Sequence, residues 1–191
     1  YKRQIQISPA SKNCINIMEI RKVDNSVNEL LDGPTLDASA LAGKIQRLHI
    51  FFSLLIPDMS HEEKQLLDEA LIKTYARKGI THKNESLTDP QHPEQYKKMP
   101  ILEDVYNVLL ESEDTKRLAH ILNRLVHGSA SSFNQQTNVD LTNKYTVLDI
   151  SELTGSSDLL TVGMFVALDY VWDKAKENRT CLLSTSDAAD E

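Results

Sequence analysis

The stretch Gly128–Leu153, GSASSFNQQTNVDLTNKYTVLDISEL, joins the end of a helical pattern to a short apolar strand. Its first half is rich in Ser, Asn, Gln and Thr, which favour loops and turns because their side chains bond to nearby backbone. The run Lys144–Ile150 that follows is nearly continuous in apolar residues, which is typical of a strand buried on both faces of a parallel sheet. Such a junction favours an α/β fold.

Four helices in a row are predicted before this junction. The first has apolar residues at three- and four-residue steps and runs from a cap at Thr35 or Asp37 to about Ile56. The second begins with the clearest local signal of the chain, the capping box Ser60–Glu63, and closes at Gly79.

The remaining two helices follow a polar segment. Residues 80–98 contain two prolines and no apolar period, so they predict an exposed loop. Pro100 suits the first position of the third helix, and the fourth extends from about Glu113 to Gly128.

Strand character lies on both sides of these helices. The alternation over Arg3–Ile7 predicts a strand, and after the strand at Lys144–Ile150 a long helix is expected over Asp158–Asn178, with an apolar face broad enough to pack on a sheet. Strand, helical excursion, strand and helix is the order of an α/β domain with a large, mostly α-helical insertion.

Composition narrows the class of protein. The chain has 191 residues, of which 40% are apolar, and a net charge of −7 with acids and bases interspersed, so direct nucleic-acid binding is disfavoured. Cys14 and Cys181 lie far apart without metal-ligand spacing, which favours a reducing, cytoplasmic setting. The longest apolar stretch, Leu48–Pro57, is too short to span a bilayer, so no transmembrane segment is expected.

The two ends of the chain suggest a piece of a longer protein. The sequence starts without methionine and directly in a strand pattern. Residues 181–191 (CLLSTSDAADE) change character abruptly and resemble translated sequencing-adapter read-through, so we expect a disordered tail that is not native. A genuine acidic, disordered tail is the alternative.

Catalytic motifs are mainly absent. The pair Gly43–Lys44 lacks both the first glycine and the hydroxyl of a phosphate-binding loop, and it lies inside a helical pattern. Asp149 ends the run YTVLD and is a candidate for the magnesium-organising acid of a nucleotide hydrolase, although Ile150 stands where glutamate usually follows. His61–Glu62 lacks the second histidine of a metalloprotease motif and is interpreted as part of a helix cap. No metal site is predicted.

Five stretches, in order, resemble the C-terminal nucleotide-hydrolase domain of the large assembly ATPase of type IV secretion and conjugative-transfer systems, the VirB-four/TraC/TraE group. They are IQISPASKNCINIMEI (Ile5–Ile20), MPILEDVYNVL (Met99–Leu109), GSASSFNQQTNVDL (Gly128–Leu141), YTVLDISEL (Tyr145–Leu153) and GMFVALDYVWDKAKENR (Gly163–Arg179). Ile17 departs from the family, where proline is usual.

The resemblance implies a RecA-like P-loop ATPase that uses ATP and magnesium, is hexameric in many systems, and works with other secretion-channel subunits at the cytoplasmic face of the inner membrane. It powers pilus assembly and the transfer of DNA or protein. In such proteins the phosphate-binding loop precedes the first matching stretch and the Asp-Glu strand follows the last, so this segment is expected to hold no catalytic residue and to be inactive alone.

The same resemblance divides the chain into four parts. Residues 1–24 are expected to be a strand segment of a partial RecA-like core, 25–130 the helical insertion, 131–180 a core strand plus helix, and 181–191 the tail.

Four polar residues of the junction are the candidates for nucleotide binding, together with Asp149: Asn134, Thr137, Asn138 and Asp140. They could lie near the nucleotide or a subunit contact, or they could only cap and turn the chain between helix and strand. Two hypotheses for the whole chain stay open, a catalytically incomplete piece of an ATPase and a stand-alone, non-enzymatic helical interaction module.

Overall fold

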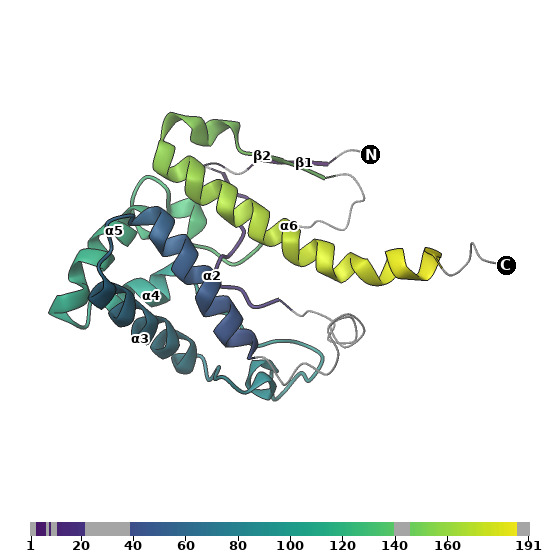
Figure 1. The fold of residues 1–191 in the computed structure, drawn as a ribbon, viewed down its shortest axis with the longest axis horizontal. Coiled ribbons are helices and arrows are strands. Elements are labelled where there is room, and N and C mark those ends of the chain that lie inside the picture. Colours follow the sequence, from purple (N-terminus) through teal and green to yellow (C-terminus); the bar gives the residue numbers. More distant parts are fainter. Residues whose placement is uncertain (1–2, 7, 9–10, 22–38, 140–145, 187–191) are drawn as a thin grey trace.

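A computed structural model gives the fold of the chain (Figure 1). The structure describes residues 3–6, 8, 11–21, 39–139 and 146–186.

Two short strands pair in parallel, although about 140 residues separate them. β1 (Arg3–Gln6) lies beside β2 (Thr146–Asp149), with Ile5 opposite Leu148. The predicted parallel pairing is therefore confirmed. The predicted burial on both faces is wrong, because the sheet has only two strands among the described residues and leaves Val147 38% exposed.

Helix α2 (Ala40–Leu55) begins where a serine can cap it. The Oγ atom of Ser39 accepts a hydrogen bond from the backbone N–H of Ala42 at 3.3 Å. The predicted cap at Thr35 or Asp37 is wrong, and both residues lie outside the described part of the chain.

Helix α3 (His61–Arg77) begins and ends as predicted. Ser60 and Glu63 form the capping box, in which each side chain accepts a hydrogen bond from the other residue's backbone N–H. Gly79 follows with φ of +70°, a conformation that glycine adopts without a steric penalty.

The segment over 80–98 is mostly exposed, as predicted, but it has an apolar anchor. A 3-10 turn at Asn84–Leu87 buries Leu87, and a single antiparallel bridge joins Thr88 to Tyr96. The segment is thereby held against the helices.

Helix α4 (Leu102–Leu109) begins two residues after Pro100, so proline is not at its first position. The carboxylate of Asp104 accepts a hydrogen bond from the backbone N–H of Ile101 and caps the helix instead. A 3-10 turn at Glu113–Thr115 leads into α5 (Lys116–Val126).

After α5 come two further 3-10 turns, Ser131–Phe133 before β2 and Ser151–Gly155 after it, and then the long helix α6 (Ser157–Ser186). The predicted end of this helix near Asn178 is wrong, and the change of composition at Cys181 does not interrupt it. Residues 187–191 of the expected tail lie outside the described residues.

Helix α6 begins within the body of the molecule, and its C-terminal part projects beyond the other elements (Figure 1). In Figure 1 it runs between the strand pair and α2, and its main helix partner is α2. We expected the buried face of α6 to pack on a sheet. This expectation is wrong, because the buried face packs on the helices.

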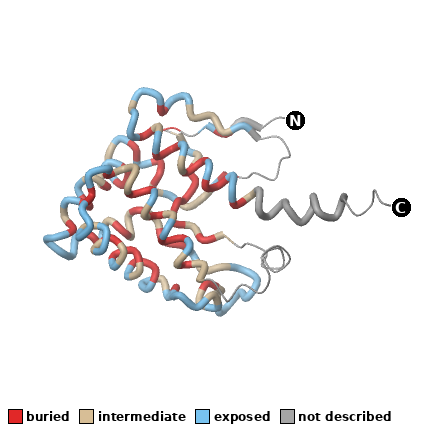
Figure 2. The backbone as a smooth tube through the Cα atoms, viewed as in Figure 1, coloured by how far each residue is buried: buried red, intermediate tan, exposed pale blue. Residues whose placement is uncertain are grey.

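One hydrophobic core joins the parts of the chain. It contains residues of β1, of the segment 15–20 and of each α-helix, and Figure 2 shows buried positions, in red, along each of these helices. Met18 is fully buried in it. The predicted α/β organisation with a large helical insertion is confirmed.

Candidate functional site

The polar loop of the junction binds the N-terminal segment of the chain. The side-chain Oδ1 of Asn138 accepts a hydrogen bond from the backbone N–H of Cys14 at 2.8 Å, and its Nδ2 donates to the carbonyl of Lys12 at 2.6 Å. The backbone N–H of Asn138 donates to the carbonyl of Cys14 at 3.1 Å. The loop therefore lies alongside residues 12–14 much as a neighbouring strand would.

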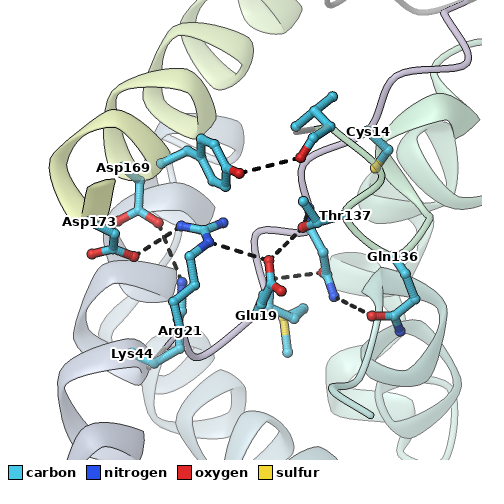
Figure 3. Close-up of polar contacts among 12 residues, drawn as sticks. Cys14, Glu19, Arg21, Lys44, Gln136, Thr137, Asp169 and Asp173 are labelled. Atoms are coloured by element: carbon cyan, nitrogen blue, oxygen red, sulfur yellow. Dashed lines mark hydrogen bonds and ion pairs between the residues drawn. The ribbon is translucent and has the colours of Figure 1, made fainter. Parts of the chain in front are cut away.

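Thr137 and Gln136 continue the same contact. The hydroxyl of Thr137 accepts from the backbone N–H of Asn16 at 2.9 Å and donates to Glu19 Oε2 at 2.5 Å. The amide of Gln136 donates to the carbonyl of Met99 at 2.8 Å. It also accepts from Asn16 Nδ2 at 3.4 Å (Figure 3).

Asn134 makes a different contact. Its Oδ1 accepts from the backbone N–H of Glu103 in the first turn of α4, at 2.9 Å, and its Nδ2 donates to the carbonyl of Val126 at the end of α5, at 3.4 Å. It therefore joins two helices of the insertion.

The structure brings three of the five predicted site residues together in one loop, and it places Asp149 elsewhere, at the end of β2. Asn134, Thr137 and Asn138 lie within one loop, and most of their partners are backbone groups far away in the sequence. Asp140 lies outside the described residues. Asp149 ends β2, where its Oδ1 accepts from the backbone N–H of Ser151 at 3.0 Å.

Cys14 lies beneath this loop. Its thiol donates to the carbonyl of Gln135 at 3.3 Å, and only 3% of the residue is exposed. Burial raises the pKa of the thiol to about 11. A thiol held in its protonated form is a poor nucleophile, so Cys14 acts here as a packing residue.

A buried cluster of charges, which we call the ionic cluster, lies next to the loop: Arg21, Lys44, Arg47, Asp169 and Asp173. Asp169 accepts from Lys44 Nζ at 3.4 Å and from Arg47 at 3.0 Å. Asp173 accepts from Arg47 at 2.7 Å. It also accepts from Arg21 at 3.0 Å (Figure 3). The cluster joins the N-terminal segment, α2 and α6.

Burial perturbs both cations of α2. Lys44 is completely buried, and this desolvation lowers its pKa to about 8 although Asp169 opposes the shift. For Arg47, burial acts to lower the pKa, but the two aspartates outweigh it and the pKa is raised. Arg47 therefore stays charged at every ordinary pH, whereas Lys44 titrates in the weakly alkaline range.

Arg21 connects the ionic cluster to the junction. Its Nε lies 3.3 Å from Glu19 Oε2, the oxygen that also accepts from Thr137, and its guanidinium stacks 4.1 Å from the ring centre of Tyr170. Among the described residues, the buried Nη2 of Arg21 has no hydrogen-bond partner. A cavity of about 320 Å³ opens beside this group, lined by Glu19, Ile20, Arg21, Glu94, Tyr96, Thr137, Tyr170 and Lys174.

Sequence reasoning missed the ionic cluster. Its only signal is weak: Lys44 and Arg47 stand three apart in one apolar helix and Asp169 and Asp173 four apart in another, so each pair shares a helix face. Nothing in the sequence shows that these two faces meet.

The arrangement is suited to holding elements together rather than to catalysis. Most polar groups of the loop bond to backbone, and the three cations of the ionic cluster pair with Asp169, Asp173 and, through Arg21, with Glu19. Within the described ranges, no group of three His, Cys, Asp or Glu side chains is placed to hold a metal ion. No helix in the described part of the chain is long and apolar enough to cross a membrane.

Comparison with solved structures finds a protein of the same fold. Over 93% of this chain, the structure superposes on VirB4 of Thermoanaerobacter pseudethanolicus with a TM-score of 0.74 and 24% sequence identity. The chain spans 63% of that VirB4 chain. No model of a known protein family matches the chain, and no curated protein matches it.

The likeness extends over most of the chain, since only 7% of it lies outside the alignment. This agrees with the predicted partial RecA-like core with a helical insertion, and it establishes the fold.

Proposed function

We propose that this chain belongs to the type IV secretion ATPases and forms part of their C-terminal nucleotide-hydrolase domain. Two independent findings support this: the five family-like stretches in the sequence, and the superposition on VirB4 over 93% of the chain. The superposition carries more weight because it includes the helical insertion, which no short motif describes.

Within such an ATPase, we assign this segment a structural role. β1 and β2 contribute to the central sheet, α2–α5 form the insertion beside it, and the 134–138 loop with the ionic cluster fixes the insertion to the core. Because Asn134, Thr137 and Asn138 bind protein backbone, we assign them this positioning role rather than contact with the nucleotide.

The proposal extends to the whole protein. It binds ATP and magnesium through residues outside this segment, assembles with copies of itself and with other channel subunits, and acts in the cytoplasm at the inner face of the cell membrane. ATP hydrolysis there drives pilus assembly and the transfer of DNA or protein.

The sequence of the genomic locus tests the proposal. It should encode Gly-x-x-x-x-Gly-Lys-Ser/Thr within a few tens of residues before Tyr1, and an apolar strand ending in Asp-Glu soon after Thr180. Stop codons on both sides with neither motif would leave the alternative, a stand-alone interaction module.

A biochemical test follows once the complete protein is available. It should hydrolyse ATP with magnesium, and replacing the lysine of its phosphate-binding loop by alanine should abolish the activity. The 191-residue chain should be inactive, and that result alone does not distinguish the two hypotheses.

A further inference from the structure

The guanidinium of Arg21 has one edge without hydrogen-bond partners. Among the described residues, neither its Nε nor its Nη2 has such a partner, and only 7% of the side chain is exposed. Glu19 Oε2 lies 3.3 Å from Nε and forms an ion pair, but the two groups are not aligned for a hydrogen bond. Buried donors are nearly always paired in native proteins, so these two N–H groups are candidates for binding a ligand.

The two donors form a fork that is fixed in place. In arginine, Nε–H and one N–H of Nη2 point the same way from the planar guanidinium, and this fork matches the two oxygens of a carboxylate. The Nη1 atom of Arg21 donates to Asp173 Oδ2 at 3.0 Å, and the centre of the Tyr170 ring lies 4.1 Å from Cζ. Figure 3 shows the guanidinium between Asp173 and Glu19. A donor pair that is already held rigidly loses little conformational entropy on binding a ligand.

The cavity that Arg21 lines is large enough for a small organic molecule. Its volume is about 320 Å³, at the lower end of the range for ligand pockets. Ile20, Tyr96 and Tyr170 supply apolar side-chain surface to its lining, and Lys174 adds a second cation. The cavity therefore combines paired donors with a surface on which the apolar part of a ligand can pack.

The charges around the cavity favour a ligand of low charge. Glu19 and Glu94 line it together with the two cations, so these four side chains carry no net formal charge. A phosphate-like dianion needs a surplus of positive charge, whereas a carboxylate is bound by directed hydrogen bonds from one arginine. A carboxylate is therefore the better match.

We propose that this cavity binds a small organic carboxylate, with the two carboxylate oxygens on Nε and Nη2 of Arg21 and the apolar part of the molecule against Tyr96 and Ile20. The site lies where the N-terminal segment, the 80–98 segment, the 134–138 loop and α6 meet. The inference does not rest on the proposed function, because it uses only the residues around the cavity.

Three aromatic probes that differ in one polar group test the site in the 191-residue chain. Benzoate is a monoanion, benzamide is its neutral counterpart, and phenylphosphonate is a dianion at pH 8. Dissociation constants are measured by NMR titration at an ionic strength held constant with sodium chloride. We expect a Kd on the order of 1 mM for benzoate and binding at least about tenfold weaker for the other two.

Two results of this comparison would overturn the inference. Equal affinity for benzamide would show that the cavity selects only apolar surface. Equal or tighter binding of phenylphosphonate would show that it selects phosphate-like groups and not carboxylates.

Substitutions locate the binding. Arg21→Gln should weaken benzoate binding at least about tenfold, and Glu19→Gln should strengthen it about threefold, because a repelling charge is removed. Lys73→Gln is the matched control: Lys73 lies on α3, outside the cavity, its side chain is 55% exposed, and the affinity should not change. Unchanged affinity in Arg21→Gln contradicts the proposed site.

A map of the backbone amide shifts in the unmodified chain decides the matter even if Arg21→Gln does not fold. Benzoate should shift the amides of Ile20, Tyr96 and Thr137 most strongly, because these residues line the cavity. Shifts centred instead on His49 and Ile50, which line a separate groove of α2, would place the binding elsewhere and overturn the inference.

Discussion

Asp169 forms ion pairs with two cationic side chains in a buried environment. Lys44 and Arg47 both donate to it, and its side chain is 4% exposed. A buried pair of this kind contributes little to stability relative to apolar residues, but breaking it leaves an uncompensated charge. The residue is therefore more sensitive to substitution than the strength of its contacts suggests.

Asp169→Asn should accordingly destabilise the protein strongly. We expect the free energy of unfolding to fall by about 3 kcal/mol in urea titrations, because Lys44 remains buried without a counter-charge. Asp158→Asn in the same helix is the control: its partner Arg124 is 3.9 Å away and both side chains are largely exposed, so the loss should stay below about 1 kcal/mol. Equal losses in the two variants would contradict this account.

Lys44 gives the stability a definite pH dependence. The pKa of Lys44 is about 8 in the folded protein, whereas an ordinary, solvent-exposed lysine has a pKa of 10.5. Between these two pH values the unfolded chain therefore binds more protons than the folded protein. This group therefore makes the protein more stable as the pH rises from about 8 to 10.5, by at most about 3 kcal/mol.

The measurement compares wild type with Lys44→Met in urea at pH 7.5, 9 and 10. The free energy of unfolding of the wild type should rise relative to that of the variant. Cys14 acts in the opposite direction, because its pKa is raised in the folded state, but it is present in both proteins and cancels in the difference. A difference that does not change with pH would show that Lys44 keeps an ordinary pKa.

Residue roles were the hardest feature to predict from sequence. The polar loop was identified as either a local turn or part of a site, and neither alternative named its partners in residues 12–19, since hydrogen bonds over more than a hundred residues leave no local pattern. Lys44 was identified in the sequence only as part of the Gly43–Lys44 pair. Its burial was not predicted, because its counter-charge, Asp169, lies in a helix that is distant in the sequence. Asp149 stays a candidate in a complete domain.

At the scale of elements, local sequence was more informative. The capping box Ser60–Glu63 fixed the start of α3 because both partners lie within one turn, and Gly79 fixed its end. The start of α2 and the end of α6 were predicted wrongly, since Ser39 and the helical residues beyond Asn178 follow no strong local signal.

Two glycines inside helices should respond oppositely to alanine. A Cβ atom at Gly163 of α6 would lie 2.2 Å from the Cδ1 of Leu153, which is buried, whereas one at Gly43 of α2 would meet nothing within 4 Å. We expect Gly163→Ala to destabilise by about 1–3 kcal/mol and Gly43→Ala to stabilise by about 0.5–1 kcal/mol, measured by thermal and urea unfolding. A stable Gly163→Ala variant would show that Leu153 can move aside.

For the whole molecule, the order of strand, helical insertion, strand and helix was predictable because hydrophobic period distinguishes helices from strands. The packing of α6 on α2 was not, since a sequence shows how apolar a helix is and not which element lies against it. The assignment of 25–130 as a separate part stays a prediction.

A single core implies a single unfolding transition. Trp172 is the only tryptophan and reports on α6, whereas circular dichroism reports mainly on the helices α2–α5. Because the ionic cluster and the core join these parts, the two signals should follow the same urea curve. A helical signal that persists after the fluorescence change would show that the insertion unfolds independently.

The pairing of β1 with β2 has a consequence for synthesis on the ribosome. Arg3 can pair with Thr146, its partner in the strand register, only after Thr146 has been synthesised. At typical rates of chain elongation this delay is roughly 7 to 30 seconds, during which the helices can fold but the first strand has no neighbour within the described chain. Ile5, almost completely buried in the finished protein, lacks the cover of its partner strand β2 throughout that interval, so we expect a chaperone that shields nascent chains to bind there.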